Sequence, residues 1–353
     1  MGDDSWVSRP KFISDEIVQI VADRVVEQIE TYSLQSFAIE IHGGEPLLFG
    51  INRMRSLLET FEASIGRQIV RFSLQTNGLL LNADWVDLFE EYNVHVGISL
   101  DGPPSPNPLR LTPEGNDSTP QLIDVLDAVR SSRPRFSPGI LAVLSDDSDI
   151  RNLIDWFPSN GFRSFDFLLP LGNYVSPPVG ITNKDLMTQK LIEAFDYWHS
   201  LKDNRPQIRF FEIMIIGLMG HEIVLDSFGG DLRRLCVVES DGSIGANDVI
   251  RFCGGTFSED SINVKTHTLD THSEHFRLES IQKLCAKCRS CDMLNACGGG
   301  YLPDRFDGKT FDNPSYYCDV IYAVSRHIFS KITATAPKES IIYQHRVDLD
   351  NYA

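Results

Sequence analysis

Short apolar runs and helical patterns alternate along the first two thirds of the chain. Ser14 is a candidate helix cap, and the apolar residues after it recur at helical spacing as far as Ile29. The predicted strands are 37–41, 69–74, 94–100, 139–144 and 164–169, and the helices after residue 50 are 52–63, 83–92, 120–130, 148–157 and 183–201. This alternation predicts a parallel α/β sheet with right-handed crossovers.

Polar and glycine-rich sequence follows three consecutive predicted strands. Gly43, Gly44 and Glu45 follow the first strand, Asn77 follows the second, and Ser99 lies at the end of the third. Because the carboxyl ends of parallel strands meet at one edge of the sheet, these residues are expected to face one pocket. The Glu45 carboxylate suits an ammonium group, and Asn77 and Ser99 suit hydroxyl or carboxylate partners.

The cysteines all lie in the last third of the chain, and their number is odd. They are Cys236, Cys253, Cys285, Cys288, Cys291, Cys297 and Cys318. The first residues lack the apolar core of a secretion signal, so a disulfide framework is not expected. The clustering predicts thiolates around a metal ion or an iron–sulfur cluster. A Cys-x2-Cys pair is also zinc-finger spacing, so spacing alone leaves zinc open.

Length and charge restrict the remaining classes of function. With 353 residues, the chain suits one large α/β unit or two packed domains. The glycine-containing segment 228–230 predicts a domain boundary that divides the chain into 1–228 and 229–353. A net charge of −17 argues against nucleic acid as a partner. No apolar stretch is long enough for a membrane helix, so a cytoplasmic protein is expected.

The strings HGGEPLL, QTNG and SLDGP together resemble the radical S-adenosylmethionine (SAM) superfamily, and within it the peptide and protein maturases with a C-terminal SPASM domain. The resemblance implies a partial (β/α)6 TIM-like barrel whose first strand is missing from this sequence, followed by a cysteine-rich SPASM-like domain. It also implies that Gly43, Gly44 and Glu45 bind the amino group of SAM and that Ser99 binds its ribose. Arg110 keeps the spacing of a ligand for the SAM carboxylate.

Two further segments bear on the implied SAM pocket. Asn77 in QTNG and the stretch 168–178 resemble pocket segments of the same family. The family often places a His-Asp pair before the arginine, whereas this chain has Pro106 and Asn107. The loop before Arg110 therefore departs from the family pattern.

The C-terminal spacing also resembles the SPASM pattern. Four cysteines match the thiolates that hold an auxiliary [4Fe–4S] cluster: Cys288, Cys291, Cys297 and Cys318. A second auxiliary site would draw on Cys236 and Cys253, with Cys285 as a possible recruit, but Tyr301 occupies the position where the family places its next cysteine. The second site is therefore expected to be incomplete or unusually ligated.

One element of the family pattern is missing from this sequence. The family holds its SAM-binding cluster with Cys-x3-Cys-x2-Cys after the first strand, and here no cysteine precedes Cys236. The segment 1–6, MGDDSW, resembles sequence that follows this motif in related maturases, which favours Met1 being an internal methionine of a longer protein. The alternative is a pseudoenzyme that keeps the barrel and the auxiliary cluster.

The implied function is modification, by crosslinking, of a ribosomally made precursor peptide. The implied cofactors are SAM and a [4Fe–4S] auxiliary cluster, and the implied electron donor is a flavodoxin or ferredoxin. Two alternatives stay open: a non-catalytic scaffold that binds a peptide or partner, and a zinc-stabilised α/β binding protein.

Overall fold

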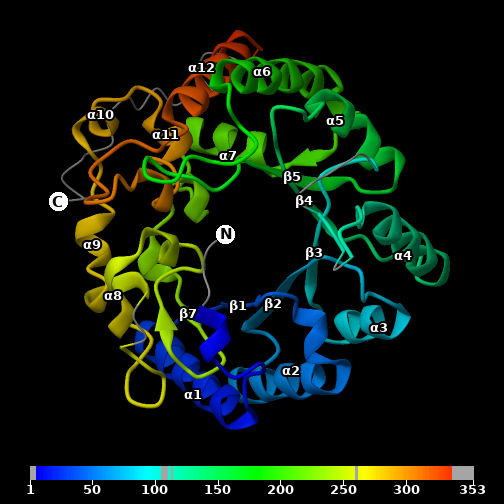
Figure 1. Cartoon of the computed structure of the whole chain (residues 1–353), viewed down its shortest axis with the longest axis vertical. Helices are drawn as coiled ribbons and strands as arrows, with labels where there is room; N and C mark the ends of the chain where they lie inside the picture. Colours follow the sequence, from blue (N-terminus) through cyan, green and yellow to red (C-terminus); the bar gives the residue numbers. More distant parts are fainter. Residues whose placement is uncertain (1–4, 105–109, 113, 259–260, 336–353) are drawn as a thin grey trace.

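The computed structural model describes residues 5–104, 110–112, 114–258 and 261–335. In this part of the chain, six strands form one parallel sheet in the order of the sequence. The strands are β1 (Phe37–Ile41), β2 (Val70–Thr76), β3 (His95–Ser99), β4 (Gly139–Val143), β5 (Ser164–Leu168) and β6 (Gln207–Ile208). Each strand pairs with the next one, and the sheet curls into a partial barrel (Figure 1). The predicted fold class is confirmed.

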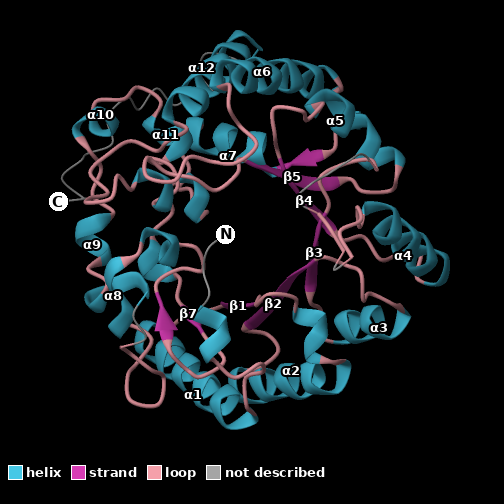
Figure 2. Ribbon diagram, in the orientation of Figure 1, coloured by secondary structure: helices cyan, strands magenta, loops and turns pink. Residues whose placement is uncertain are grey.

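The helices of the barrel lie outside the strands (Figure 2). They are α1 (Asp15–Tyr32), α2 (Ile51–Ile65), α3 (Ala83–Glu91), α4 (Thr119–Ser132), α5 (Ile150–Ser159), α6 (Lys184–Ser200) and α7 (Arg209–Leu218). The Ser14 side chain accepts a hydrogen bond from the Ile17 backbone N–H at 3.3 Å, as expected of a helix cap. The buried face of α1 includes Val18, Val21 and Val25.

Strand β6 and helix α7 complete the barrel, and neither was predicted from the sequence. The two residues of β6 are too few to give a periodic signal. The apolar run 210–216 lies in α7, where Phe211 and Met214 are fully buried. Helix α7 contacts β5 on one side and the C-terminal helices α11 (Leu294–Cys297) and α12 (Cys318–Thr335) on the other. It therefore joins the barrel to the cysteine-rich region.

The C-terminal region consists of short elements and one long helix. The short ones are β7 (Val237–Val238), β8 (Ile244–Gly245), α8 (Thr271–His275), α9 (Leu278–Ile281), α10 (Ala286–Arg289) and α11. Strands β7 and β8 form an antiparallel hairpin around Asp241-Gly242. Helix α12 packs on α6 and α7, and the Val264 carbonyl accepts a hydrogen bond from Arg24 of α1 at 3.1 Å. The region thus lies between α1 and α7, the two ends of the barrel (Figure 1).

The proposed boundary segment is packed tightly against the cysteine-rich region. A Cβ atom at Gly229 would lie 2.2 Å from the Gly298 carbonyl oxygen, so only glycine fits at this contact. The division into 1–228 and 229–353 stays a prediction. Within the described residues, no helix combines the length and the apolar character needed to span a membrane.

Candidate functional site

Glu45 is the centre of the hydrogen bonding at the carboxyl ends of β1 and β2. Its Oε1 accepts from the Leu47 N–H at 2.9 Å and from the Thr76 hydroxyl at 2.7 Å, and its Oε2 accepts from the Asn77 N–H at 2.8 Å. A carboxylate offers about four acceptor positions. The three bonds therefore hold the carboxylate in place and leave room for one more donor.

The two glycines before Glu45 expose backbone beside this carboxylate. Gly43 has a φ of +92°, which favours glycine, and both Gly43 and Gly44 are exposed. A Cβ atom at either position would meet nothing within 4 Å. Packing within the chain therefore does not require these glycines, and their backbone is open to a ligand.

Ser99 and Asn77 lie on the neighbouring strand ends. The Ser99 hydroxyl accepts a hydrogen bond from the Gln75 side-chain amide at 2.9 Å, which links β2 to β3 and leaves the hydroxyl proton for another partner. The Asn77 carbonyl oxygen accepts from the Leu79 N–H at 3.0 Å and shapes the turn, while the residue is exposed. We call residues 43–45, Asn77, Ser99 and Arg110 the strand-end site.

Arg110 is held by a carboxylate of its own chain. Its Nε and Nη2 donate to the two carboxylate oxygens of Asp101 at 2.6 and 2.7 Å. Asp101 also accepts from the Val143 N–H at 2.9 Å, so the pair is anchored to β4. Nη1 lies outside this pair. Pro106 and Asn107 lie outside the described residues.

Four cysteines, Cys288, Cys291, Cys297 and Cys318, lie close together and are called the cysteine quartet. Cys288 interacts electrostatically with Cys297 and Cys318, Cys297 with Cys291 and Cys318, and Cys318 with Cys291. In five of the six possible pairs of the quartet, one cysteine is thus close enough for its thiolate form to raise the pKa of the other. Burial raises the pKa of Cys288 to about 12 and that of Cys297 to about 11. Without a cation these groups stay protonated, and a bound metal centre would hold them as thiolates.

The glycine-rich loop after Cys297 shapes the quartet. Gly298, Gly299 and Gly300 all have positive φ, between 56° and 93°. A Cβ atom at Gly299 would lie 2.4 Å from the Leu284 side chain, and one at Gly300 would lie 2.7 Å from Ser315. The glycines thus let the loop pack between the segments that carry Cys285 and Cys318.

A single metal ion and an iron–sulfur cluster place different demands on four cysteines. Among the described residues, no three His, Cys, Asp or Glu side chains are placed to hold one metal ion. A zinc ion gathers its four ligands on one atom, whereas each thiolate of a [4Fe–4S] cluster binds a different iron. The four thiols of the quartet are the kind of ligand that either centre uses.

The other three cysteines, which the sequence predicts for a second site, have different described neighbours. The Cys285 and Cys288 sulfur atoms are 3.5 Å apart, so Cys285 borders the quartet. Cys253 lies 3.9 Å from the Pro303 carbonyl oxygen. Burial raises the pKa of both Cys236 and Cys253 to about 12, and their charged neighbours are Asp270 and Asp304 respectively.

Tyr301 belongs to a polar network that the sequence did not indicate. Its hydroxyl donates to the Asn247 Oδ1 at 3.1 Å, and the Asn247 Nδ2 donates to Asp226 at 2.9 Å. Burial raises the pKa of Tyr301 well above its ordinary value. A hydrogen-bonded tyrosine thus stands where the resemblance leads one to look for a cysteine.

A buried carboxylate on β5 was also missed. Asp166 accepts from the Arg209 Nε at 2.6 Å, and burial raises its pKa although Arg209 opposes the shift. Neither residue belongs to a recognisable motif, and the pair forms only because β6 brings the start of α7 to β5.

The fold and the two sites define a class: a partial parallel α/β barrel with a polar strand-end site and a separate cysteine site. Residues 11–157 match the radical SAM superfamily. Over 350 residues the chain is 24% identical to the cysteine-type anaerobic sulfatase-maturating enzyme of Clostridium perfringens (strain 13 / Type A), a match that covers 95% of this chain and 92% of that protein. Part of the barrel thus matches the radical SAM superfamily, and the chain is similar over most of its length to an anaerobic sulfatase-maturating enzyme.

Solved structures match the same fold. Native anSMEcpe with bound AdoMet and Cp18Cys peptide superposes with a TM-score of 0.76 at 23% identity, over 91% of this chain and 90% of that one. Streptococcus suis SuiB bound to precursor peptide SuiA superposes with a TM-score of 0.58 at 16% identity, over 85% and 69% of the two chains. The radical SAM barrel predicted from the sequence is confirmed at the level of the fold.

Proposed function

We propose that this chain is a radical SAM maturase that binds SAM at the strand-end site and modifies, by crosslinking, a ribosomally made peptide. The observation that carries the proposal is the Glu45 carboxylate, which is fixed by three hydrogen bonds and keeps an acceptor position beside two open glycines. This arrangement suits the ammonium group of a methionine moiety. Ser99 and Asn77 would bind hydroxyl groups on the same edge, and Nη1 of Arg110 would bind the carboxylate.

We assign one auxiliary [4Fe–4S] cluster to the cysteine quartet. Such a cluster supplies one-electron transfer when bound. The quartet would hold it through four thiolates, and the glycine loop would keep its site closed on one side. A flavodoxin or ferredoxin is the proposed external electron donor.

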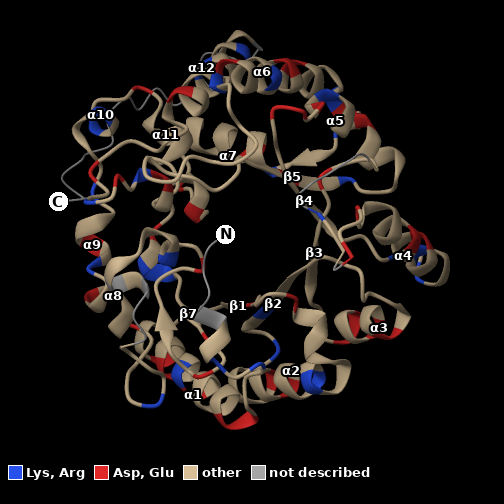
Figure 3. Cartoon of the chain, viewed as in Figure 1, with Lys and Arg blue, Asp and Glu red and all other residues tan. Residues whose placement is uncertain are grey.

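A peptide is the proposed substrate because the matched proteins act on or bind peptides and proteins by name. Acidic residues are spread over the outer helices of this chain, including α1, α3 and α4 (Figure 3). With 49 acidic against 32 basic residues, the surface favours a precursor with a basic leader segment.

A second candidate function is a non-catalytic peptide-binding scaffold. Cleavage of SAM in this family needs three thiolates in the barrel, and no cysteine precedes Cys236 in this sequence. This sequence therefore does not itself supply these three thiolates. The strand-end site and the quartet serve either function.

Iron and acid-labile sulfide content test the cluster. After anaerobic reconstitution, the chain is expected to hold about four iron and four sulfide per molecule. Cys318→Ala should lower both well below the wild-type values, whereas Cys253→Ala should leave them unchanged, because Cys253 lies apart from the quartet. Stoichiometric zinc without iron would overturn the cluster and favour the zinc-stabilised alternative.

SAM binding and SAM cleavage separate the two candidate functions. We expect calorimetry to show binding of SAM to the chain. Production of 5′-deoxyadenosine under reducing, anaerobic conditions by protein purified from its native source would establish the enzyme. Binding without 5′-deoxyadenosine would favour the scaffold, and absence of both would reject the strand-end assignment.

A further inference from the structure

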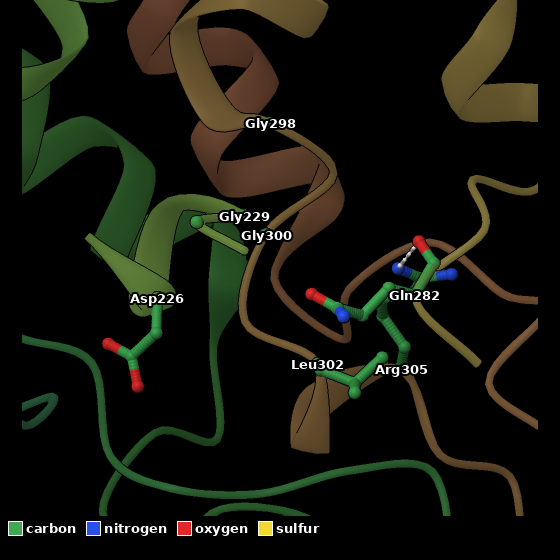
Figure 4. Close-up of a pocket in the computed structure, with 8 residues that line it drawn as sticks. Asp226, Gly229, Gln282, Gly298, Gly300, Leu302 and Arg305 are labelled. Carbon is green, nitrogen blue, oxygen red and sulfur yellow. Dashed lines mark hydrogen bonds between the residues drawn. The ribbon is translucent and has the colours of Figure 1, made fainter. Parts of the chain in front are cut away.

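Arg305 is a buried cation whose hydrogen bonds all go to neutral acceptors. Only 3% of the surface of Arg305 is exposed. Nε donates to the carbonyl oxygens of Phe311 and Asn313 at 3.0 and 3.1 Å, Nη1 donates to that of Gln282 at 3.2 Å, and Nη2 donates to that of Lys283. Figure 4 shows Arg305 beside Gln282.

No acidic side chain compensates this charge directly. Among the described residues, no carboxylate lies within ion-pair distance of Arg305, although such pairs form elsewhere in the chain. Burial lowers the pKa of Arg305, but an arginine stays protonated at neutral pH. A buried charge without a counter-charge is unfavourable, so a source of negative charge nearby is expected.

Two cysteines and one aspartate influence the charge of Arg305. Burial lowers the pKa of Arg305, whereas the thiolate forms of Cys288 and Cys285 and the exposed Asp312 carboxylate would raise it. Cys288 belongs to the quartet, and it would carry a negative charge when bound to iron. The negative charge that Arg305 lacks would thus come from the loaded cysteine site.

We propose that Arg305 is the counter-charge of the cluster held by the cysteine quartet and that it raises the reduction potential of that cluster. This inference rests on the proposed cluster site. Four thiolates give a [4Fe–4S] centre a net negative charge, and reduction adds one more. A fixed positive charge stabilises the reduced form more than the oxidised form, so the potential rises.

Hydrogen bonds fix the position of Arg305, and little solvent reaches its guanidinium group. Its bonds to residues 282–283 and 311–313 tie it to the segments that lead to Cys285 and to Cys318. The cavity between Arg305, Gln282 and the glycine loop measures about 20 Å³, which is room for roughly one water. Solvent therefore screens the guanidinium very little.

Lys287 provides a matched control cation. It lies near Cys318, but its side chain is 61% exposed and it also faces Asp319 at 3.3 Å. Water and the neighbouring carboxylate screen its charge. Two cations thus lie beside the quartet, and we expect the buried one to set the potential.

The test is a potentiometric titration of the reconstituted full chain, followed by the electron paramagnetic resonance signal of the reduced cluster. Arg305→Gln keeps one hydrogen-bond donor and removes the charge, and we expect the midpoint potential to shift to more negative values. Arg305→Lys keeps the charge and should stay near the wild-type potential, as should Lys287→Gln. A wild-type potential in Arg305→Gln would overturn the proposal.

Iron content decides the case in which Arg305→Gln holds no cluster. Loss of iron in Arg305→Gln with a normal cluster in Arg305→Lys would support the role of the charge. Loss of iron in both variants, or equal shifts in both, would overturn it, because hydrogen bonding alone would then explain the effect. A wild-type chain that binds no iron would instead refute the cluster assignment on which the inference rests.

Discussion

Glu45 combines a structural role and the proposed ligand role in one carboxylate. Glu45→Gln replaces one accepting oxygen by an NH2 group, so at least one of the donors from Leu47, Thr76 and Asn77 loses its partner. We expect a loss of about 1–2 kcal/mol in the free energy of unfolding and at least about tenfold weaker SAM binding. Thermal denaturation and calorimetry measure the two effects.

Glu30→Gln is the matched control for this substitution. Glu30 is an exposed residue at the end of α1, and the same change there should alter neither quantity. Equal SAM affinity in wild type and Glu45→Gln would contradict the role given to Glu45.

Motif residues could be located from the sequence, whereas residues that act through packing could not. Glu45 and Ser99 follow recognisable strand ends, and the structure places both at the same edge of the sheet. Arg305 carries no local signal, because its significance depends on segments 282–283 and 311–313 meeting around it. The sequence offered Cys285 as a recruit for the second site. Only the structure shows that its sulfur atom lies 3.5 Å from that of Cys288.

At the scale of elements, the longer parallel strands could be predicted from the sequence pattern, whereas the two-residue strand β6 could not. Strand β1 coincides with the predicted 37–41, and β4 ends one residue before the predicted end at 144. Strand β6 has two residues and is defined only by its pairing with β5. Such a strand is fixed by tertiary structure and has no sequence pattern of its own.

The pair of Asp166 and Arg209 ties β5 to the start of α7. Asp166 is 5% exposed, and burial raises its pKa above the unfolded value of about 3.9. A folded state that holds the proton more tightly loses stability as the pH rises above about 4. Arg209 opposes this shift, so Arg209→Met should raise the pKa of Asp166 further and deepen the loss.

We therefore expect Arg209→Met to cost about 2 kcal/mol of unfolding free energy near pH 7 and much less near pH 3, where Asp166 is largely protonated in both states. Urea denaturation at the two pH values measures this difference. The variant that carries Asp166→Asn as well should show no such pH dependence. An equal loss at both pH values would mean that the packing of Arg209, and not its charge, holds α7.

At the scale of the whole molecule, the two parts depend on different sources of stability. The barrel has a continuous sheet and an extensive core of buried apolar residues. Around the quartet, α10 and α11 have four residues each, and helices of this length are not stable alone. A cluster bound to four cysteines would crosslink residues 288–318 much as disulfides do, so metal binding and local folding are coupled there.

Removal of iron should therefore loosen one part of the molecule and leave the rest intact. With a chelator under anaerobic conditions, we expect amide hydrogen exchange in 285–302 to become at least about tenfold faster, because opening costs less without the crosslink. Strands β2–β4 should be unchanged. The body of α12 should also stay protected, because Val320, Val324 and Ile328 are buried and the helix packs on α6 and α7.

Cys318→Ala should reproduce the exchange pattern of the iron-free protein, and Cys253→Ala should keep that of the loaded protein. Faster exchange throughout the barrel would show that the cluster stabilises the whole fold, which contradicts the independence argued from the sheet and its core. Unchanged exchange in 285–302 would show that packing of the glycine loop, through Gly299 on Leu284 and Gly300 on Ser315, is sufficient to order the site without metal.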